Sequence, residues 1–392
     1  MKILHIITRL IVGGAQENTL LTCEGLAKRG HEVILLTGPS EGREGSLMQR
    51  AQTSGYRVIT TPHLVRAPHP WHDAAAYFEI KKLCRDLKPD VVHTHSSKAG
   101  IIGRAAGWHV KTQDKPIVIH TIHGLPFHPY QNAAVNRLWI TLEKWAARRC
   151  DHIITVADAM TMQAMAAGVG DGRSSLFSTV YSGMDVEPFI HPRTDRASLR
   201  QQLAIPANRF VFVTIARLQP LKGHDDLLQQ AEALFAAVPD AHFLWIGDGV
   251  FRPRFEAAIR AKGWADRFTL TGLVPPERVP ELLPAADALV HPSYREGLAR
   301  ALPQCLLAGL PVISYDCDGA GEVCITGKTG MLVPTGDATA LRAAMVQLAA
   351  DRTAASQLGE TGRLLCLSRF PAAVMVEQIE AVYRRALANP RP

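Results

Sequence analysis

Short apolar runs alternate with longer amphipathic stretches in the first half of the chain, and this pattern constrains the fold more than any other feature. Runs rich in Val, Ile and Leu predict strands at Lys2–Thr8, Glu32–Thr37, Arg57–Thr60, Asp90–Thr94, Pro116–Thr121 and His152–Val156. Helical patterns separate them, for example Glu17–Arg29, Asp73–Leu87 and Arg137–Arg149. Strands that are apolar throughout indicate a parallel sheet buried on both faces. Their alternation with helices predicts an α/β, doubly wound, Rossmann-like domain.

The second half repeats this pattern. Strands are expected at Phe210–Ile215, Ala241–Ile246, Phe268–Thr271, Ala288–His291, Pro311–Tyr315 and Met331–Val333, and helices at Asp225–Phe235 and Phe251–Lys262. Between the halves, Pro188–Asn208 is rich in Pro, Arg, Asp and Gln and has the composition of a linker. We therefore predict one domain at 1–190, a second at 191–370, and a C-terminal helix within 371–392 that packs back on the first domain. Two such domains are expected to face each other across a cleft, with ligands at the carboxyl ends of the strands.

The composition limits the kinds of binding partner that the chain is expected to have. The net charge of +7 suits an anionic ligand or an anionic membrane surface, but no basic block is interleaved with aromatic residues, so nucleic acid is not expected. The seven cysteines are scattered without a C-x-x-C pair, which argues against a zinc site and for a reducing cytoplasm. The N-terminal MKILHIITRL runs directly into a Gly turn and is interpreted as a strand. No window approaches the ~18 apolar residues of a transmembrane helix.

The stretch Arg295–Gly309 contains the most informative polar residues. Glu296 lies in a Gly-containing turn ahead of an apolar helical run, and backbone N–H groups near Gly297 and Leu298 would face an anion at the helix start. Gln304, about two turns into that helix, is expected to point inward. A carboxylate beside free N–H groups suits a ligand that is both polyhydroxylated and anionic, such as a sugar nucleotide. The alternatives are a carboxylate that only stabilises the helix dipole and a surface amide.

Two other segments are candidate phosphate sites. The strand Phe210–Ile215 is followed by Arg217, and Lys222 precedes a Gly turn and a helix. Two fixed cations at the end of a strand could bind a diphosphate, or they could be solvated surface residues. Their position at the strand end favours phosphate binding. Near the N-terminus, Gly13 and Gly14 lie in a turn between a strand and a helix, where backbone N–H groups can approach a phosphate. Many Gly-Gly turns bind nothing, and this one is not a G-x-G-x-x-G fingerprint.

The order of motifs resembles the retaining family 4 glycosyltransferases of the GT-B fold, over essentially the whole chain. The matching segments are the Gly13-Gly14 turn, D-V-V-H-x-H at Asp90–His95, H-T-x-H-G at His120–Gly124, N-G-[MIV]-D-x-x-x-F at Ser182–Phe189, G-R-L-x-x-x-K-G at Ala216–Gly223 and G-D-G at Gly247–Gly249. Ser182 stands in the family's Asn place and Ala216 in its Gly place. The family signature is two Glu residues separated by seven others, and the second is Gln304 here.

The resemblance implies a role for each matching residue. Arg217 and Lys222 would hold the donor diphosphate, Glu296 would contact the transferred sugar, and His123 would lie beside the reacting sugar. The family residue at position 304 binds the nucleotide ribose. Because an amide replaces a carboxylate there, one charge-assisted hydrogen bond to the ribose is expected to be lost, at a cost of ~1.5–3 kcal/mol in binding free energy. The family generally works without a bound metal, so we expect no metal site and no cofactor beyond the donor.

The predicted function is transfer of a hexosyl unit from a nucleoside diphosphate sugar, UDP-linked by expectation, to a glycan or lipid-linked glycan acceptor in cell-envelope or exopolysaccharide synthesis. A sugar-nucleotide epimerase or phosphorylase of the same fold, and a nucleotide-sugar-binding protein without turnover, are the alternatives. The helix Arg137–Arg149 combines Trp and Leu with basic residues. It either contacts an anionic membrane from the cytoplasmic side or packs its apolar stripe on the sheet.

Overall fold

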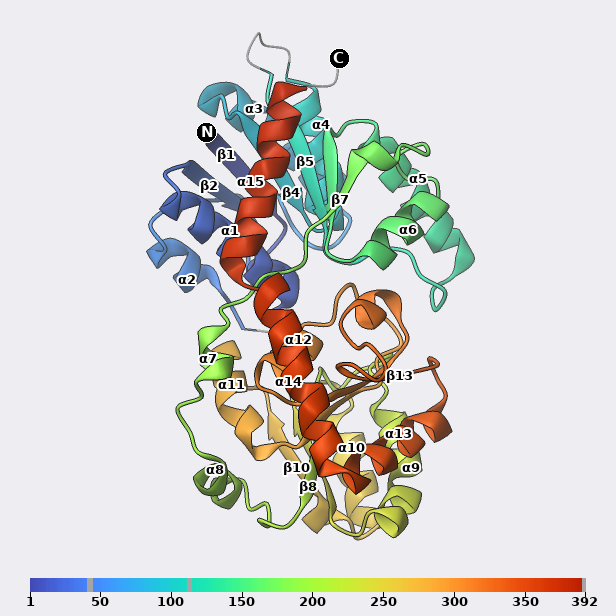
Figure 1. The fold of residues 1–392 in the computed structure, drawn as a ribbon. Coiled ribbons are helices and arrows are strands. Elements are labelled where there is room, and N and C mark those ends of the chain that lie inside the picture. Colours follow the sequence, from blue (N-terminus) through green and yellow to red (C-terminus); the bar gives the residue numbers. More distant parts are fainter. Residues whose placement is uncertain (41–44, 111–114, 390–392) are drawn as a thin grey trace. The chain divides into compact units, whose positions relative to one another are not determined.

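The computed structural model describes residues 1–40, 45–110 and 115–389. The chain forms two compact units (Figure 1). Unit 1 contains Met1–Met184 and Ala372–Pro392, and unit 2 contains Asp185–Pro371. The division after Met184 comes six residues before the expected end at 190. Within the described ranges, no helix is both long and apolar enough to cross a membrane.

Unit 1 is built on a seven-stranded parallel sheet in the order β3-β2-β1-β4-β5-β6-β7. Its strands are β1 Lys2–Ile7, β2 Glu32–Thr37, β3 Arg57–Thr60, β4 Val91–His95, β5 Ile117–Ile122, β6 His152–Thr155 and β7 Phe177–Thr179. The first six begin and end within one residue of the expected positions, which confirms the doubly wound pattern. β7 was not expected, because only one of its three residues is apolar.

Helices cover both faces of this sheet. They are α1 Gly14–Lys28, α2 Met48–Thr53, α3 Pro70–Leu87, α4 Ser97–Trp108, α5 Ala133–Ala147, α6 Asp158–Ala166 and α15 Ala372–Ala388. The last helix, α15, runs beside α1 (Figure 1). Met375, Val376 and Ile379 lie on one side of α15 and are at most 2% exposed, because the helical period turns them towards the same core.

Unit 2 has a six-stranded parallel sheet in the order β10-β9-β8-β11-β12-β13. The strands are β8 Phe210–Ile215, β9 Ala241–Ile246, β10 Phe268–Gly272, β11 Ala288–His291, β12 Val312–Tyr315 and β13 Gly330–Val333. The helices are α7 Glu187–Ile190, α8 Arg196–Gln202, α9 His224–Ala237, α10 Arg252–Ala261, α11 Val279–Leu282, α12 Ala301–Leu307, α13 Ala338–Ala350 and α14 Arg352–Arg369. Each of the six strands again begins and ends within one residue of expectation.

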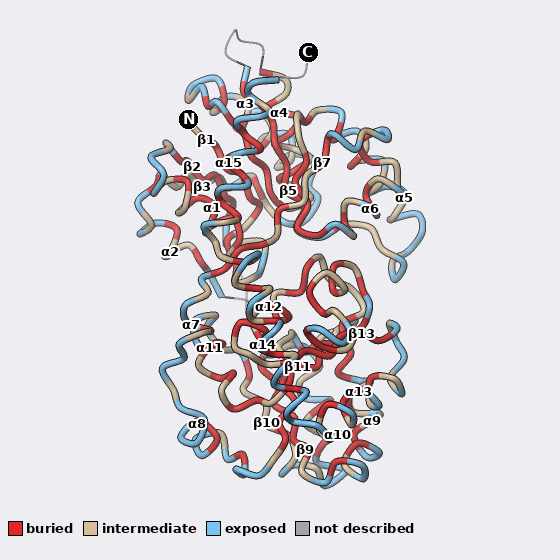
Figure 2. The backbone as a smooth tube through the Cα atoms, viewed as in Figure 1, coloured by how far each residue is buried: buried red, intermediate tan, exposed pale blue. Residues whose placement is uncertain are grey.

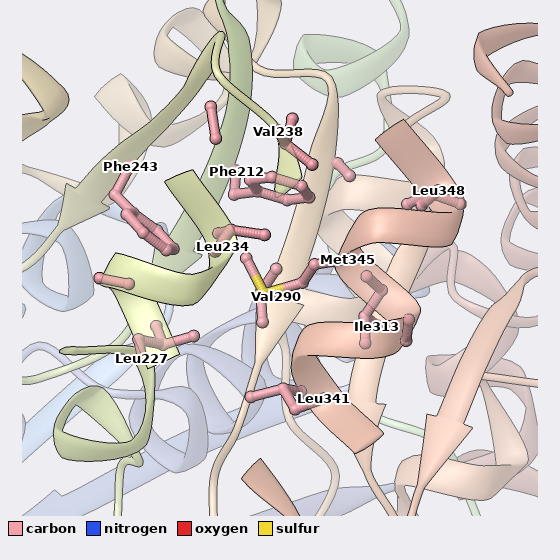
Figure 3. Packing of buried hydrophobic residues seen from close by; sticks show 14 of the residues in the cluster. Phe212, Leu227, Leu234, Val238, Phe243, Val290, Ile313, Leu341, Met345 and Leu348 are labelled. Atoms are coloured by element: carbon pink, nitrogen blue, oxygen red, sulfur yellow. The ribbon is translucent and has the colours of Figure 1, made fainter. Parts of the chain in front are cut away.

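Apolar side chains from the strands and from α9 and α13 form the core of unit 2. Phe212 and Ile313 from the sheet pack with Leu234 and Met345 from these two helices (Figure 3). In both units the central strands are buried along their length (Figure 2). Polar residues therefore reach the surface mainly where strands end, and the candidate site residues follow such ends.

The segment expected to be a linker is part of unit 2. It contains α7 and α8, and Arg200 of α8 is only 3% exposed. The Arg200 guanidinium donates to Asp287 Oδ2 at 2.8 Å and to the Ala285 carbonyl at 3.0 Å. Composition alone suggested an exposed connection, but this arginine is buried because its donors are satisfied inside the unit.

Candidate active-site residues in the two units

A lysine and a glutamate meet at the carboxyl end of the unit 2 sheet. Lys222 follows β8 and Glu296 follows β11, and Lys222 Nζ contacts Glu296 Oε1. The two side chains are only 18% and 20% exposed. Gly223, at φ 71°, makes the turn into α9, and a Cβ there would lie 1.9 Å from the Pro292 carbonyl oxygen. Only glycine fits this turn, so the sequence fixes where Lys222 is presented.

Further contacts hold Glu296 in its ionised form. Its backbone N–H donates to Asp318 Oδ2 at 2.7 Å, and His291 Nε2 lies 3.4 Å from its Oε1. Burial would raise the pKa of Glu296, but the Lys222 ammonium and the His291 imidazole outweigh burial and hold this pKa well below its ordinary range. The group is therefore a fixed carboxylate that can accept hydrogen bonds from hydroxyl groups.

Arg217 lies on the loop between β8 and Lys222 and is exposed. The neighbouring loop after β9 supports it: the Leu218 N–H donates to the Asp248 carbonyl at 3.0 Å. Added Cβ atoms at Gly247 and Gly249 would lie 2.2 and 2.3 Å from the carbonyl oxygens of the Arg217 loop. The G-D-G motif is thus explained by close packing of two loops at the carboxyl ends of adjacent strands.

The helix expected after Glu296 begins later than predicted. α12 starts at Ala301 and has seven residues, and before it Gly297 and Leu298 form a bend and Arg300 a turn. Within α12, Leu302 N–H already bonds to the Ala299 carbonyl, and Pro303 has no N–H. The prediction that residues 297–300 begin the helix was therefore wrong, whereas a contact of their backbone N–H groups with a ligand stays a prediction. Gly297 instead accepts from the Gly319 N–H at 3.2 Å, and Leu298 is 8% exposed.

Gln304 is the fourth residue of α12, one turn into the helix and not two. Its side chain is half-buried, and among the described residues its amide has no hydrogen-bond partner. The nitrogen and the oxygen of this amide are therefore available to a ligand.

In unit 1, His123 follows β5 and borders a cavity of about 270 Å³. The other residues that line it are Ala15, Ser96, Ser97, His120, Thr121, Ile122, Gly124, Pro126 and Glu143. Ala15 comes directly after Gly13 and Gly14 at the start of α1. The structure therefore brings the Gly-Gly turn and His123 to one region of unit 1, as it brings Lys222 and Glu296 together in unit 2.

Two residues that line this cavity, Ser96 and Glu143, were missed from the sequence, and so was Arg104, which pairs with Glu143. Ser96 has φ 62° and ψ 155°, a conformation that is costly for a residue with a Cβ, and its hydroxyl lies 2.8 Å from that of Thr8. Arg104 Nη2 donates to Glu143 Oε2 at 2.7 Å, and both side chains are at most 3% exposed. In the sequence, these residues could have been noticed because Glu143 is the one glutamate of the basic helix α5 and Arg104 is the one arginine of the Gly- and Ala-rich helix α4.

Comparison with known families agrees with this geometry. The model described as "Glycosyltransferase Family 4" matches residues 12–187, and "Glycosyl transferases group 1" matches residues 195–365. The chain is 30% identical to 2-deoxystreptamine N-acetyl-D-glucosaminyltransferase of Streptomyces fradiae, over 84% of this chain and 81% of that protein. It is 26% identical to UDP-Gal:alpha-D-GlcNAc-diphosphoundecaprenol alpha-1,3-galactosyltransferase of Escherichia coli, over 99% of this chain and 98% of that protein.

Solved structures show the same fold. HepE of Anabaena in complex with UDP superposes with a TM-score of 0.80 at 21% identity, covering 98% of this chain and 100% of HepE. Sucrose-phosphate synthase of Thermosynechococcus elongatus gives a TM-score of 0.81 at 23% identity, covering 99% of both chains. Together with the family matches, these findings confirm that the chain belongs to glycosyltransferase family 4 and is a GT-B glycosyltransferase of the type that uses nucleotide-sugar donors.

Proposed function

We propose that this enzyme transfers a hexosyl unit from a UDP-linked sugar to a glycan or lipid-linked glycan acceptor, with retention of the anomeric configuration. The observation that carries the proposal is the Lys222–Glu296 pair, a cation and an ionised carboxylate held together at the carboxyl ends of parallel strands. The Escherichia coli relative is named for a UDP-Gal donor and HepE was solved in complex with UDP, which supports the choice of nucleotide.

Three charged residues near the carboxyl end of the unit 2 sheet have a part in this reaction. Lys222 and Arg217 neutralise the charge that grows on the diphosphate as the bond to the sugar breaks, so no divalent metal is required. Glu296 accepts hydrogen bonds from hydroxyls of the transferred sugar. Backbone atoms of Gly297 and Leu298 border the donor, and Gln304 contacts the ribose through its amide.

Unit 1 contributes Gly13, Gly14 and His123 beside the reacting sugar and the acceptor. The bond from the anomeric carbon to the phosphate oxygen breaks while the bond to the acceptor oxygen forms on the same face. The acceptor proton passes to the departing phosphate oxygen. This route retains the configuration and needs no pair of carboxylates flanking the bond, unlike the route in glycosidases.

The test is a UDP-release assay with a panel of UDP-hexoses and with lipid-linked and soluble glycan acceptors, followed by NMR of the anomeric centre of the product. Release that requires an acceptor, with a retained product, supports the proposal, and an inverted product refutes retention. Acceptor-independent interconversion of the donor sugar would indicate an epimerase. Donor binding without turnover would indicate a binding protein.

Two substitutions test the donor site. Lys222→Ala is expected to lower kcat about 10²–10³-fold, the loss typical when one charge-stabilising group is removed. The matched control is Lys262→Ala, since Lys262 is 58% exposed just after α10, where it pairs with the surface residue Glu232 and lies over the Trp264 ring. Near-normal turnover of Lys222→Ala would refute the phosphate assignment. Gln304→Glu restores the family carboxylate, and unchanged donor affinity in this variant would show that residue 304 is not a ribose ligand.

We also propose that α5 contacts an anionic membrane surface. Leu138 and Trp145 are 58% and 39% exposed, although packing on the sheet was the alternative expectation for them. The face of α5 that is buried carries Glu143, Ala146 and Ala147. Arg149 lies 4.0 Å above the Trp145 ring, so basic and apolar groups share the exposed face.

Co-sedimentation with phosphatidylglycerol vesicles tests this contact. The double variant Leu138→Ser/Trp145→Ser is expected to lose binding, and Val250→Ser, at a residue of unit 2 that is 79% exposed, is the control. Equal binding by both variants would refute the role of α5.

A further inference from the structure

Four buried histidines lie on the strands close to the His123 cavity. His5 lies on β1, His93 and His95 on β4, and His120 on β5, and all four are at most 2% exposed. His5 and His93 are directly paired in the register of β1 and β4, and His95 follows two residues later on the same face of the sheet. Parallel pairing of neighbouring strands therefore collects several imidazoles beside the proposed reaction site.

Two of these rings, those of His5 and His95, form a hydrogen-bonded row with His123. His5 Nδ1 lies 3.0 Å from His95 Nε2, and His95 Nδ1 lies 3.1 Å from His123 Nε2. His93 stands outside the row. Its Nδ1 lies 2.5 Å from the Tyr383 hydroxyl and its Nε2 lies 2.7 Å from the Thr121 hydroxyl. The row thus connects the centre of β1 to the cavity.

A bound metal ion is the competing explanation. One nitrogen from each of His5, His93 and His95 lies within 4.8 Å of the others, which is close enough to share a cation. The group contains no carboxylate to balance a buried double charge, and both nitrogens of His93 already meet hydroxyl groups. The separations of 3.0 and 3.1 Å in the row are hydrogen-bond distances, and each such bond requires one proton between the nitrogens.

Proton counting leaves two arrangements of the row. Burial lowers the pKa of His5 to about 3, and burial together with the neighbouring imidazoles lowers the pKa of His95 well below its ordinary value, so both rings are neutral near pH 7. A neutral imidazole has one N–H and one lone pair. All three rings must therefore donate in the same direction, either from His5 towards His123 or from His123 towards His5.

The far end of the row decides between them. His5 Nε2 is buried and has no hydrogen-bond partner among the described residues. If the row donated towards His5, this atom would be a buried N–H without an acceptor, which is among the rarest groups in folded proteins. If the row donates towards His123, the same atom is only an unused lone pair. The second arrangement is therefore favoured.

We propose that His5 and His95 are positioning residues that hold His123 in its Nδ1–H tautomer, with the Nε2 lone pair bound to His95. The inference rests on the proposed function, in which His123 borders the reacting sugar. In this state Nδ1 of His123 carries a proton and its Nε2 lone pair is bound to His95, so the ring has no lone pair with which to remove the acceptor proton. His123 is therefore not a general base.

Long-range ¹H–¹⁵N NMR of the full chain, with ring-labelled histidine, tests the tautomer directly. The signals of His123 are assigned from their loss in His123→Asn. At about pH 7.5 we expect Nδ1 protonated and Nε2 unprotonated. A proton on Nε2, or a doubly protonated ring, overturns the proposal, and so does one equivalent of zinc found by elemental analysis of protein purified without chelator.

Two substitutions at His5 separate positioning from general structural support. Asn places an amide donor near Nδ1, whereas Leu offers none. We expect His123 to keep its tautomer in His5→Asn and to become mixed in His5→Leu, with kcat lowered about 3–10-fold, the value of one hydrogen bond, and the donor KM unchanged. An unaltered tautomer in folded His5→Leu overturns the role of His5. If this variant does not fold, the wild-type spectrum decides.

The tautomer and the activity are measured separately, so the two proposals can fail independently. If the expected tautomer is found but no hexosyl transfer occurs, the histidine row is supported and the proposed substrate is wrong. Hexosyl transfer with a proton on Nε2 of His123 would keep the proposed function and overturn the positioning role.

Discussion

Mild acid is expected to destabilise unit 1 through its buried histidines. His5, His93, His95 and His120 all have their pKa lowered, with burial as the largest cause. The unfolded chain therefore takes up protons as the pH falls through about 6.5, while the folded unit does not. For such groups the stability is complete above the unfolded pKa and decreases as the pH falls below it.

The loss of folding free energy on acidification depends little on how far each pKa is lowered. If the folded pKa lies well below 5.5, moving from about pH 7.5 to about pH 5.5 costs roughly 1.4 kcal/mol for each histidine. Four such groups cost roughly 5 kcal/mol, which is comparable to the whole stability of many domains. In unit 2, burial lowers the pKa of His224 to about 3 and that of His242 to about 4, so the corresponding cost is roughly 3 kcal/mol.

Urea unfolding at about pH 7.5, 6.5 and 5.5, followed by peptide-resolved hydrogen exchange, measures the loss in each unit. Unit 1 is expected to lose more stability than unit 2, with most of its loss below pH 6.5. His191→Asn is the control, because the His191 side chain is 78% exposed and is not one of the buried histidines. Constant stability of unit 1 from pH 7.5 to 5.5, or a rise on acidification, would refute the reasoning.

Three further predictions concern stability, each measured by urea unfolding. Glu380→Gln is expected to cost about 1–3 kcal/mol, because Glu380 is 5% exposed and accepts from two arginines. Burial would raise the pKa of Glu380, but its arginine and histidine partners outweigh burial and lower this pKa to about 2. The stability that Glu380 contributes is therefore lost as the pH falls from about 4.5 towards 2. Unchanged stability of the wild-type protein over this range would contradict the prediction. Arg104→Met is expected to cost about 3–5 kcal/mol, and adding Glu143→Leu should recover most of that, unless the pair is uncoupled. Gly223→Ala should cost more than about 1 kcal/mol and lower turnover, because its Cβ would meet the Pro292 carbonyl; an unaffected variant would exclude this strain.

The sheets could be predicted because their strands are continuous apolar runs, and this signal is local. β7 failed the same criterion, since Phe177 is its one apolar residue. The start of α12 was misplaced because Leu298 and Ala299 extend the apolar pattern, although both precede the helix. Apolar periodicity shows which residues are buried, but the backbone hydrogen bonds decide where a short helix begins.

The site residues could be found only where a motif or a strand end marked them. Lys222 and Glu296 each follow a strand, so their proximity follows from the parallel topology. Arg104 and Glu143 are 39 residues apart, and their bond depends on how α4 and α5 pack on the sheet. The bond between His5 and His95 depends likewise on the pairing of β1 with β4. Tertiary contacts of this kind are not encoded in any local pattern.

The proposals together restrict where the acceptor proton can go. Among the described residues that line the cavity in unit 1, Glu143 is the one carboxylate, and Arg104 already holds it at 2.7 Å. If the row donates as inferred, the Nε2 lone pair of His123 is occupied and its Nδ1 carries a proton. The other imidazole at this cavity, His120, is a poor base, because burial lowers its pKa well below its ordinary value. In the proposed reaction the departing phosphate therefore accepts the proton. In that proposal Lys222 and Arg217 stabilise the phosphate, and a lysine ammonium can share its charge with the phosphate while it keeps its own proton.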